Sequence, residues 1–346
     1  MASLQEVADA AGVSRSVASR VLTGDKRARI SDATRERVRH AADRLQYVPN
    51  HRSRALRFAR SGAVGLIVPD VNNAVFAEML GGVQDRAREA GMSVLLSQID
   101  PPPPGRNQLR ELITAGRVDG VLLQRREDFD DAMLEAVLAG PLPAVLINSK
   151  LSGRAGSAVL DDVAGAALAT RHLIELGHEH IGHLAGVPTH DTAIRRHRGF
   201  CAAMAEAGLG VRPDWIQRSG WEAPGGAAAA EELLRCSAVP TGLVVSSVNA
   251  AIGALSALAR RGVRVPEDLS VVSINDTWVA ETWTPALTTV RMPLRALGRR
   301  ACELLLAHLS GAALTDIVVD DPAPELLVRG STGRPRAAAD LAQLLS

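Results

Sequence analysis

The chain has 346 residues, of which 47% are hydrophobic, and a net charge of +1. This length suffices for two or three domains with a large core. No apolar run approaches 18 residues, no charged-then-apolar leader opens the chain, and three scattered cysteines lie in apolar settings. We therefore expect a cytoplasmic protein rather than a membrane or disulfide-stabilised one.

The charge is divided unevenly along the chain. Residues 1–60 hold 13 Arg or Lys against 6 Asp or Glu, a net of +7, whereas the remainder has a net charge of −6. A basic head on an acidic body predicts that only the head binds a polyanion. The alternative, a merely solvated charged face, is less favoured because of the helical framework beneath it.

The stretch VADAAGVSRSVASRVL, residues 7–22, predicts two short helices joined by a tight turn at Gly12. Ser14 can cap the second helix, and Val17, Ala18, Val21 and Leu22 give that helix one buried stripe. The outward face then carries Arg15, Ser16, Ser19 and Arg20. A helix with two guanidinium groups and two hydroxyls on its outer face is suited to a DNA major groove.

A third helix is predicted to begin at the cap Ser31 and to end before Pro49, which gives a head over residues 1–47. Residues 48–61 form an arginine-rich hinge without acids. The hinge is either a disordered basic linker or a segment that folds on DNA and presents Leu56 to a minor groove.

From Gly62 onward, short apolar runs alternate with amphipathic helices, among them a helix ending at Ala115 and helices at 163–176, 192–207, 225–235 and 249–261. This alternation predicts parallel sheets covered by helices. The length accommodates two such lobes, with strand ends facing a shared cleft. We place lobe 1 at 62–160 plus 290–315 and lobe 2 at 161–289 plus 316–330, with Ser157–Asp162 as crossover and 331–346 as a tail.

The chain resembles the lactose/galactose repressor (LacI/GalR) family of transcription regulators. The motifs that carry the resemblance are VADAAGVSRSVASRVLTG, ISDATRERV, YVPN, the ALR of the hinge, VGLIVPDVNNAVFAEML, VDGVLL, LATRHLIELGH, RVPEDLSVV and TPALTTVRMP. The resemblance implies an all-α helix-turn-helix head on a two-lobed α/β body of the periplasmic-binding-protein-like type I. It also implies a homodimer, usually a repressor, that binds a near-palindromic operator in double-stranded DNA under allosteric control by an effector. A bacterial, nucleoid-associated location follows from the same resemblance.

The resemblance assigns roles to individual residues of the head and hinge. Arg15 and Ser16 match the variable positions that select bases, Ser19 and Arg20 match a Ser-Arg pair typical of the family, and Leu56 matches the minor-groove wedge. A bidentate contact from Arg15 to guanine fits its length. The full expected DNA-binding set is Ser14, Arg15, Ser16, Ser19, Arg20, Arg29, Asn50, Arg54 and Leu56.

The expected effector cleft departs from the family. The family's usual arginine, Asn-Asp pair and acid are Ile194, Ser247-Val248 and Asn275 here, which removes partners for sugar hydroxyls. A simple monosaccharide is therefore disfavoured, and the alternative is a vestigial cleft without ligand. The expected lining is Asp70, Asn73, Phe76, Asp161, Ile194, Arg196, Trp221, Ser247, Asn275 and Trp278.

Other functions are less favoured. His178, His180 and His183 are interpreted as structural residues rather than metal ligands, because His180 and His183 would point to opposite faces of a strand. We find no Walker loop, nucleophile elbow or Cys-rich metal site, so neither an enzyme nor a cofactor is expected. A solute-binding protein would share the two-lobed body, but a basic head and no export signal argue against it.

Overall fold

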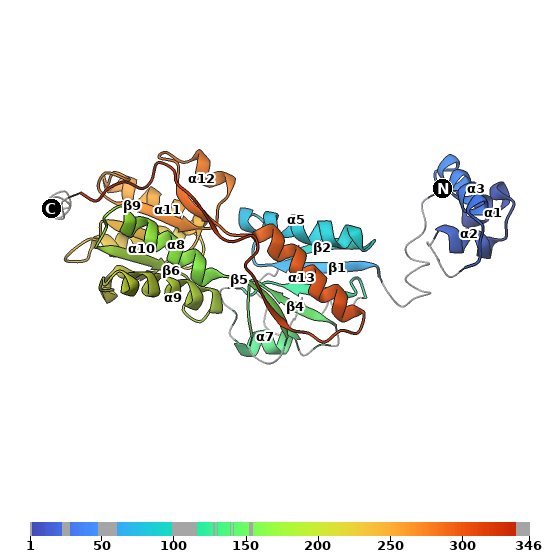
Figure 1. Cartoon of the computed structure of the whole chain (residues 1–346), viewed down its shortest axis with the longest axis horizontal. Helices are drawn as coiled ribbons and strands as arrows, with labels where there is room; N and C mark the ends of the chain where they lie inside the picture. The colour runs from blue at the N-terminus through green and yellow to red at the C-terminus, as the bar shows by residue number, and fades with distance from the viewer. Residues whose placement is uncertain are drawn as a thin grey trace. The chain divides into compact units, whose positions relative to one another are not determined.

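The computed structural model describes residues 2–22, 28–47, 61–98, 116–126, 129, 131–138, 140, 142–151 and 155–336. The chain divides into two compact units, Met1–Ser61 and Gly62–Ser346 (Figure 1). Across the described ranges, no helix has both the length and the apolar character needed to cross a membrane. The helix expected to end at Ala115 lies outside these ranges.

In its described residues, the N-terminal unit has three helices, α1 (Leu4–Ala11), α2 (Arg15–Leu22) and α3 (Asp32–Arg44). Ser3 and Glu6 form a reciprocal capping box at the start of α1. Gly12 ends α1 in the left-handed region with φ of +64°, as the predicted tight turn requires. Ser31 caps α3 by accepting a hydrogen bond from the Thr34 amide. The small core of this unit contains Val7, Ala8, Ala11, Ala18, Val21, Val38, Ala41 and Ala42.

The first sheet of the second unit has the strand order β11-β5-β4-β3-β1-β2, and every neighbouring pair is parallel. Its strands are β1 (Ala63–Val68), β2 (Ser93–Gln98), β3 (Gly120–Leu123), β4 (Ala144–Ile147), β5 (Gly156–Leu160) and β11 (Asp316–Val319). Helices α5 (Ala74–Glu89), α7 (Asp131–Leu138) and α13 (Leu294–Leu309) accompany this sheet (Figure 1). We call this assembly lobe 1.

The second sheet has the order β12-β10-β9-β8-β6-β7, with only the β10–β12 pair antiparallel. Its strands are β6 (Ile181–Ala185), β7 (Ile216–Arg218), β8 (Gly242–Val245), β9 (Ser270–Ile274), β10 (Thr288–Arg291) and β12 (Glu325–Leu327). Its helices are α8 (Asp162–Glu175), α9 (Asp191–Glu206), the 3-10 turn η1 (Pro213–Trp215), α10 (Ala223–Leu234), α11 (Val248–Arg260) and α12 (Trp278–Thr282). We call this assembly lobe 2.

The lobe boundaries expected from the sequence are wrong at two strands. β10, expected at the return into lobe 1, pairs with β9 in lobe 2. β11, expected in lobe 2, pairs with β5 in lobe 1. There the Asp316 carboxylate accepts a hydrogen bond from the Ser157 hydroxyl and forms an ion pair with Lys150. The expected crossover at 157–162 is mostly strand β5 itself.

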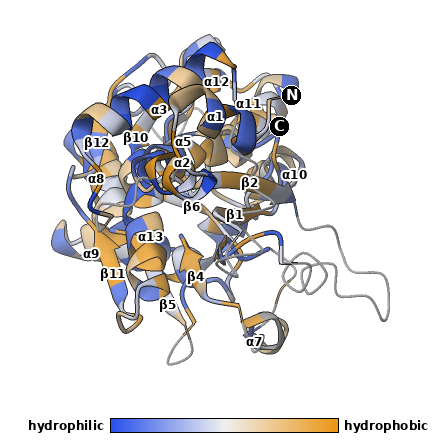
Figure 2. Ribbon diagram, turned by 90° about the vertical axis from the view of Figure 1, so that its right-hand side faces the viewer, coloured by the Kyte–Doolittle hydropathy of each residue, from blue (hydrophilic) through white to orange (hydrophobic). Residues whose placement is uncertain are grey.

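Burial explains why these segments are strands. Every residue of β1, β3, β5, β8 and β9 is buried, as expected for parallel sheets with helices on both faces. Figure 2 shows the hydrophobic colour concentrated on the strands, whereas the helices are banded in both colours. Because these strands are largely apolar, the polar side chains of the sheets lie mainly in the loops that follow the strands.

Candidate DNA-reading helix and inter-lobe cavity

Helix α2 presents the polar face that the sequence predicted. Ala18 and Val21 are buried against α1 and α3, which leaves Arg15, Ser16 and Arg20 exposed and Ser19 half-buried. Ser14 lies outside the helix, where its hydroxyl accepts a hydrogen bond from the Val17 amide at 3.3 Å. Ser14 therefore acts as a helix cap as well as a candidate phosphate contact.

Arg29 is exposed in the segment before α3. Arg35 of α3 holds this segment by donating to the carbonyls of Ala28 at 3.0 Å and Ile30 at 3.3 Å. Arg29 is thus presented by a braced backbone. Asn50, Arg54 and Leu56 lie outside the described residues.

A cavity of about 250 Å³ lies between the two lobes. Its wall is built where parallel strands end, the position at which open α/β sheets bind ligands. Lobe 1 contributes Pro69, Asp70, Asn73, Val75, Phe76, Gln124, Arg125, Arg126, Asn148 and Ser149. Lobe 2 contributes His190, Asp191, Thr192, Arg196, Trp221, Glu222, Ser247 and Asn275.

Seven of the ten expected cleft residues line this cavity, namely Asp70, Asn73, Phe76, Arg196, Trp221, Ser247 and Asn275. Asp161 does not, because its carboxylate caps α8 by accepting from the Ala164 amide at 2.9 Å. Ile194 is 54% exposed on the outside of α9. Residues two apart on a helix face nearly opposite sides, so Arg196 points inward where Ile194 cannot.

Trp278 was also expected in the cleft, but it is 70% exposed. It lines a separate groove together with Val71, Arg291 and Arg295. Trp278 is therefore not part of the inter-lobe cavity.

Trp221 provides the aromatic wall of the cavity. A side chain on Gly186 would approach the indole to 2.4 Å, so the ring lies against bare backbone. The guanidinium of Arg196 lies 5.6 Å from the ring centroid, and the His190 ring lies 6.2 Å away. The indole is therefore confined by backbone, cation and imidazole.

Arg196 is 1% exposed, yet its charge is balanced. Its Nε donates to Asp162 at 2.7 Å, and Nη1 donates to the carbonyl of Ser246. Its remaining nitrogen, Nη2, is buried and has no hydrogen-bond partner among the described residues. A buried guanidinium nitrogen without an acceptor is costly, and it marks a place for a ligand oxygen or nitrogen.

Three other cavity residues also have buried polar atoms without partners in the described part of the chain. These atoms are the side-chain oxygens of Gln124, Asn148 and Asn275. Asn148 and Asn275 also have φ of +51° and +72°, a left-handed backbone that asparagine tolerates better than most residues. The wall is consequently rich in amide groups able to pair with a ligand.

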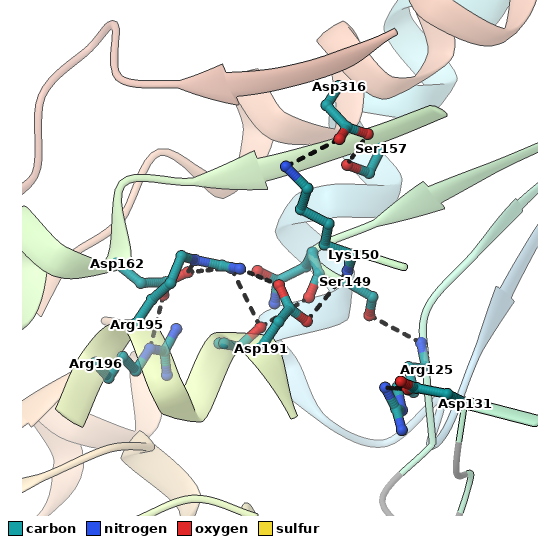
Figure 3. Close-up of polar contacts among 12 residues, drawn as sticks. Arg125, Asp131, Ser149, Lys150, Ser157, Asp162, Asp191, Arg195, Arg196 and Asp316 are labelled. Carbon is teal, nitrogen blue, oxygen red and sulfur yellow. Dashed lines mark hydrogen bonds and ion pairs between the residues drawn. The ribbon is translucent and has the colours of Figure 1, made fainter. Parts of the chain in front are cut away.

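Hydrogen bonds join the lobes on both sides of the cavity. On one side Asn73 donates to Glu222 at 3.3 Å. On the other, the Lys150 amide donates to Asp191 at 3.1 Å, and Thr192 donates to the Asn148 carbonyl at 3.0 Å (Figure 3). The two lobes are therefore hydrogen-bonded to each other in this structure.

Gln124, Arg125, Asn148 and Ser149 also line the cavity, although they were not among the residues expected there. Arg125 is held rigidly, since it donates to the carbonyl of Phe129 at 2.8 Å and to Asp131 at 2.7 Å. The Ser149 hydroxyl accepts from the Arg125 amide at 3.1 Å. A signal was available, because these residues directly follow β3 and β4, and every parallel strand ends at the cleft.

The histidines of the GHEHIGH segment have structural partners. His178 hydrogen-bonds Thr241 and Gly333, and His183 bonds the Val244 carbonyl. Burial lowers the pKa of His183 to about 3, so this imidazole is neutral. In the described ranges no three His, Cys, Asp or Glu side chains are grouped to hold a metal ion.

Comparison with known proteins shows which families share this architecture. Residues 3–50 match the family of bacterial regulatory proteins of the lacI type, and residues 170–332 match the periplasmic binding protein-like domain. The transcriptional repressor PurR of Haemophilus influenzae is 32% identical over 335 residues, which cover 96% of this chain and 98% of that protein.

Solved structures agree. A LacI family regulator from Mycobacterium smegmatis is 56% identical with a TM-score of 0.76, covering 79% of this chain and all of that one. The lac repressor dimer bound to operator and the anti-inducer ONPF is 27% identical with a TM-score of 0.76, covering 96% and 99% of the two chains. The polar face of α2, the paired parallel sheets and these matches lead to one conclusion: the chain is a DNA-binding transcription regulator and belongs to the LacI family.

Proposed function

We propose that the chain represses transcription as a homodimer that binds a near-palindromic operator in the bacterial cytoplasm. The observation that carries this proposal is the exposed face of α2, where Arg15, Ser16 and Arg20 stand on a helix fixed by a buried apolar stripe. Two such helices would read two half-sites one helical turn or a multiple apart. Arg15 would select a base, and Leu56 would wedge into the central minor-groove step.

Dimerisation is supported by apolar side chains exposed on lobe 1. Leu95 and Leu96 are 44% and 45% exposed on β2, an edge strand of its sheet. Edge strands with exposed leucines are favourable places for a second chain. The structurally similar lac repressor forms a dimer on its operator, which agrees with this assignment.

We further propose that a small molecule in the inter-lobe cavity controls operator affinity. Buried polar atoms are normally paired, and four cavity residues have such atoms without protein partners in the described ranges. A ligand that offers several N–H or O–H donors, at least one acceptor for Arg196 and a flat face for Trp221 would match them. This pattern favours a ligand over a vestigial cleft.

The cavity is more polar than the sequence predicted, which weakens the case against monosaccharides. Ile194 was expected at the place of an inward arginine, whereas Arg196 lines the cavity and Ile194 is exposed. Gln124, Arg125 and Asn148 add further polar groups to the wall. Free hexoses therefore belong in a ligand screen beside nucleosides and aromatic acids.

The operator proposal is tested by footprinting the full-length protein on DNA that flanks its own gene. We expect one protected region containing two inverted half-sites. Protection without inverted symmetry would contradict a dimeric reader, and uniform weak protection would contradict a sequence-specific one.

The ligand proposal is tested by thermal unfolding against the three compound classes, followed by calorimetry of each hit. A true cavity ligand should lose about two- to twelvefold in affinity with Trp221→Leu, because stacked aromatic contacts of this kind are worth about 0.5–1.5 kcal/mol beyond the area they bury. Ile194→Ala is the matched control, since it alters an exposed neighbour. If no compound raises the unfolding temperature, the vestigial-cleft alternative gains the support.

A further inference from the structure

One carboxylate, Asp162, serves two arginines at once. Asp162 is fully buried at the start of α8. Its Oδ1 accepts from Arg196 Nε at 2.7 Å, and its Oδ2 accepts from Arg195 Nη2 at 2.7 Å and from Nε at 3.2 Å (Figure 3). Arg196 faces the cavity, whereas Arg195 does not line it. Asp162 thus connects a cavity-facing group with one outside the cavity.

Arg195 continues the chain of contacts toward lobe 1. Its Nη1 donates to Asp191 Oδ2, and its Nη2 lies 3.4 Å from the Thr192 hydroxyl. Burial disfavours the charge of Arg195, but Asp162 and Asp191 outweigh that effect, so the pKa of its guanidinium is raised. Arg195 therefore stays charged and holds both residues with which α9 contacts lobe 1.

The chain of contacts ends on the backbone of the other lobe. Asp191 Oδ1 accepts from the Lys150 amide, and Thr192 donates to the Asn148 carbonyl. We call the hydrogen bond from the Lys150 amide to Asp191 the lobe contact. The series of hydrogen-bonded residues that leads from the cavity to it is Arg196, Asp162, Arg195, Asp191 and Lys150. Each step is a charge-assisted hydrogen bond, the stronger class of such bonds.

We propose that Asp162 is a positioning residue that couples the cavity to the lobe contact: it holds Arg196 toward the ligand and, through Arg195, holds Asp191 on the Lys150 amide. A ligand acceptor bound at Arg196 Nη2 redistributes the hydrogen bonds on Asp162, and this change reaches the Lys150 amide through Arg195 and Asp191, of which Asp191 also lines the cavity. The ligand part of this inference rests on the proposed function, whereas the relay itself is a property of the protein alone.

The composition of the chain offers a selective probe of the relay. Lys26 and Lys150 are the only lysines, so protein labelled with ¹⁵N-lysine has two lysine backbone amides. The Lys26→Arg variant assigns the Lys150 resonance. Trp221 is read separately by ¹⁹F resonance of 5-fluorotryptophan, since the chain has four tryptophans and Trp221→Phe identifies it.

Two variants test coupling in opposite directions. Arg195→Gln should speed hydrogen exchange of the Lys150 amide about tenfold, as expected for loss of support from a charged group, and should also shift the Trp221 resonance. Arg196→Lys should shift the Lys150 amide, although residue 196 makes no hydrogen bond to Lys150. Coupling must act in both directions. The relay therefore requires both the shift of Trp221 in Arg195→Gln and the shift of the Lys150 amide in Arg196→Lys.

The matched control is Arg171→Gln, which removes an exposed ion pair between α8 and α9, with Glu206 at 3.1 Å. It should leave both resonances unchanged. Asp191→Ala removes the acceptor itself and calibrates full loss of Lys150 protection. The relay is overturned if Arg195→Gln moves only Lys150 and Arg196→Lys moves only Trp221, because the two ends would then be independent.

No ligand is needed for these measurements. Failure of every compound to bind would contradict the proposed cavity ligand while leaving the relay supported by reciprocal shifts. Conversely, a bound ligand with independent ends would keep the proposed function and remove the coupling role of Asp162.

Discussion

At the scale of single residues, Trp221 depends on the absence of a side chain at Gly186. Adding a methyl group there places a carbon 2.4 Å from Trp221 Cη2, so the indole must move. We expect Gly186→Ala to shift the ¹⁹F resonance of Trp221 and to weaken cavity ligands at least tenfold. Gly210→Ala is the control, because an added methyl group there meets nothing within 4 Å. An unchanged Trp221 resonance in Gly186→Ala would contradict the close contact between the indole and Gly186.

Arg15 carries the prediction about sequence reading. Arg15→Ala should relax preference at one base pair of each half-site, with a loss of about 1–3 kcal/mol of discrimination, because the bidentate contact to guanine disappears. Selection from a random DNA library measures this directly. Arg37→Ala, which removes an exposed arginine of α3, should return the parental consensus. An identical consensus for Arg15→Ala would reassign Arg15 to the phosphate backbone.

His183 predicts how stability depends on pH. Its pKa is about 3 in the folded protein and about 6.5 when unfolded, so between these values the unfolded chain binds a proton that the folded one does not. The free energy of unfolding therefore falls as pH falls below 6.5, by about 1.4 kcal/mol per pH unit for this group. Urea unfolding of His183→Asn should show a shallower slope between pH 6.5 and 5. His180→Asn, which removes an exposed imidazole, is the control.

At the scale of elements, α5 and α13 pack through reciprocal glycines. A methyl group on Gly82 would lie 1.9 Å from the Arg295 carbonyl oxygen, and one on Gly298 would lie 2.0 Å from that of Met79. Both obstacles are backbone, which cannot rotate away. The close approach of these helices therefore requires glycine.

Gly82→Ala should accordingly lower the free energy of unfolding by about 1–3 kcal/mol, the usual cost of overpacking. Gly81→Ala is a demanding control because it is the adjacent position. The atom nearest to its methyl group is Arg295 Nη1 at 2.8 Å, at the end of an exposed side chain paired with Asp85, and alanine gains helix propensity. Chemical denaturation of both variants measures the two changes in free energy of unfolding, and equal losses would contradict the specific role of the backbone contact at Gly82.

The elements also show what sequence patterns predict and what they do not. Continuous apolar runs located β1, β8 and β9, since burial on both faces leaves a local signal. The partners of β10 and β11 were assigned wrongly, because four-residue strands carry no local record of the sheet they join. Likewise, the identity of Ile194 was readable, but the inward face of α9 depends on how the helix packs.

At the scale of the whole molecule, operator affinity should depend on dimerisation. Leu96→Lys places a charge on the exposed β2 edge and should shift sedimentation toward the monomer. Specific operator binding should then fall far more than binding to random DNA, because one head alone makes few contacts. Val328→Lys, at a residue that is 62% exposed after β12, should leave both unchanged. A dimeric Leu96→Lys protein would exclude this strand from the interface.

The late positions of β11 and β12 in the chain have a consequence for protein synthesis. Lobe 1 lacks an edge strand until residue 319 has been made, and lobe 2 lacks one until residue 327. A ribosome must therefore translate nearly the whole body before either sheet can close, whereas the helices described in the head are complete by residue 44. A nascent chain halted near residue 300 should hold a folded head on an unfinished, chaperone-dependent body.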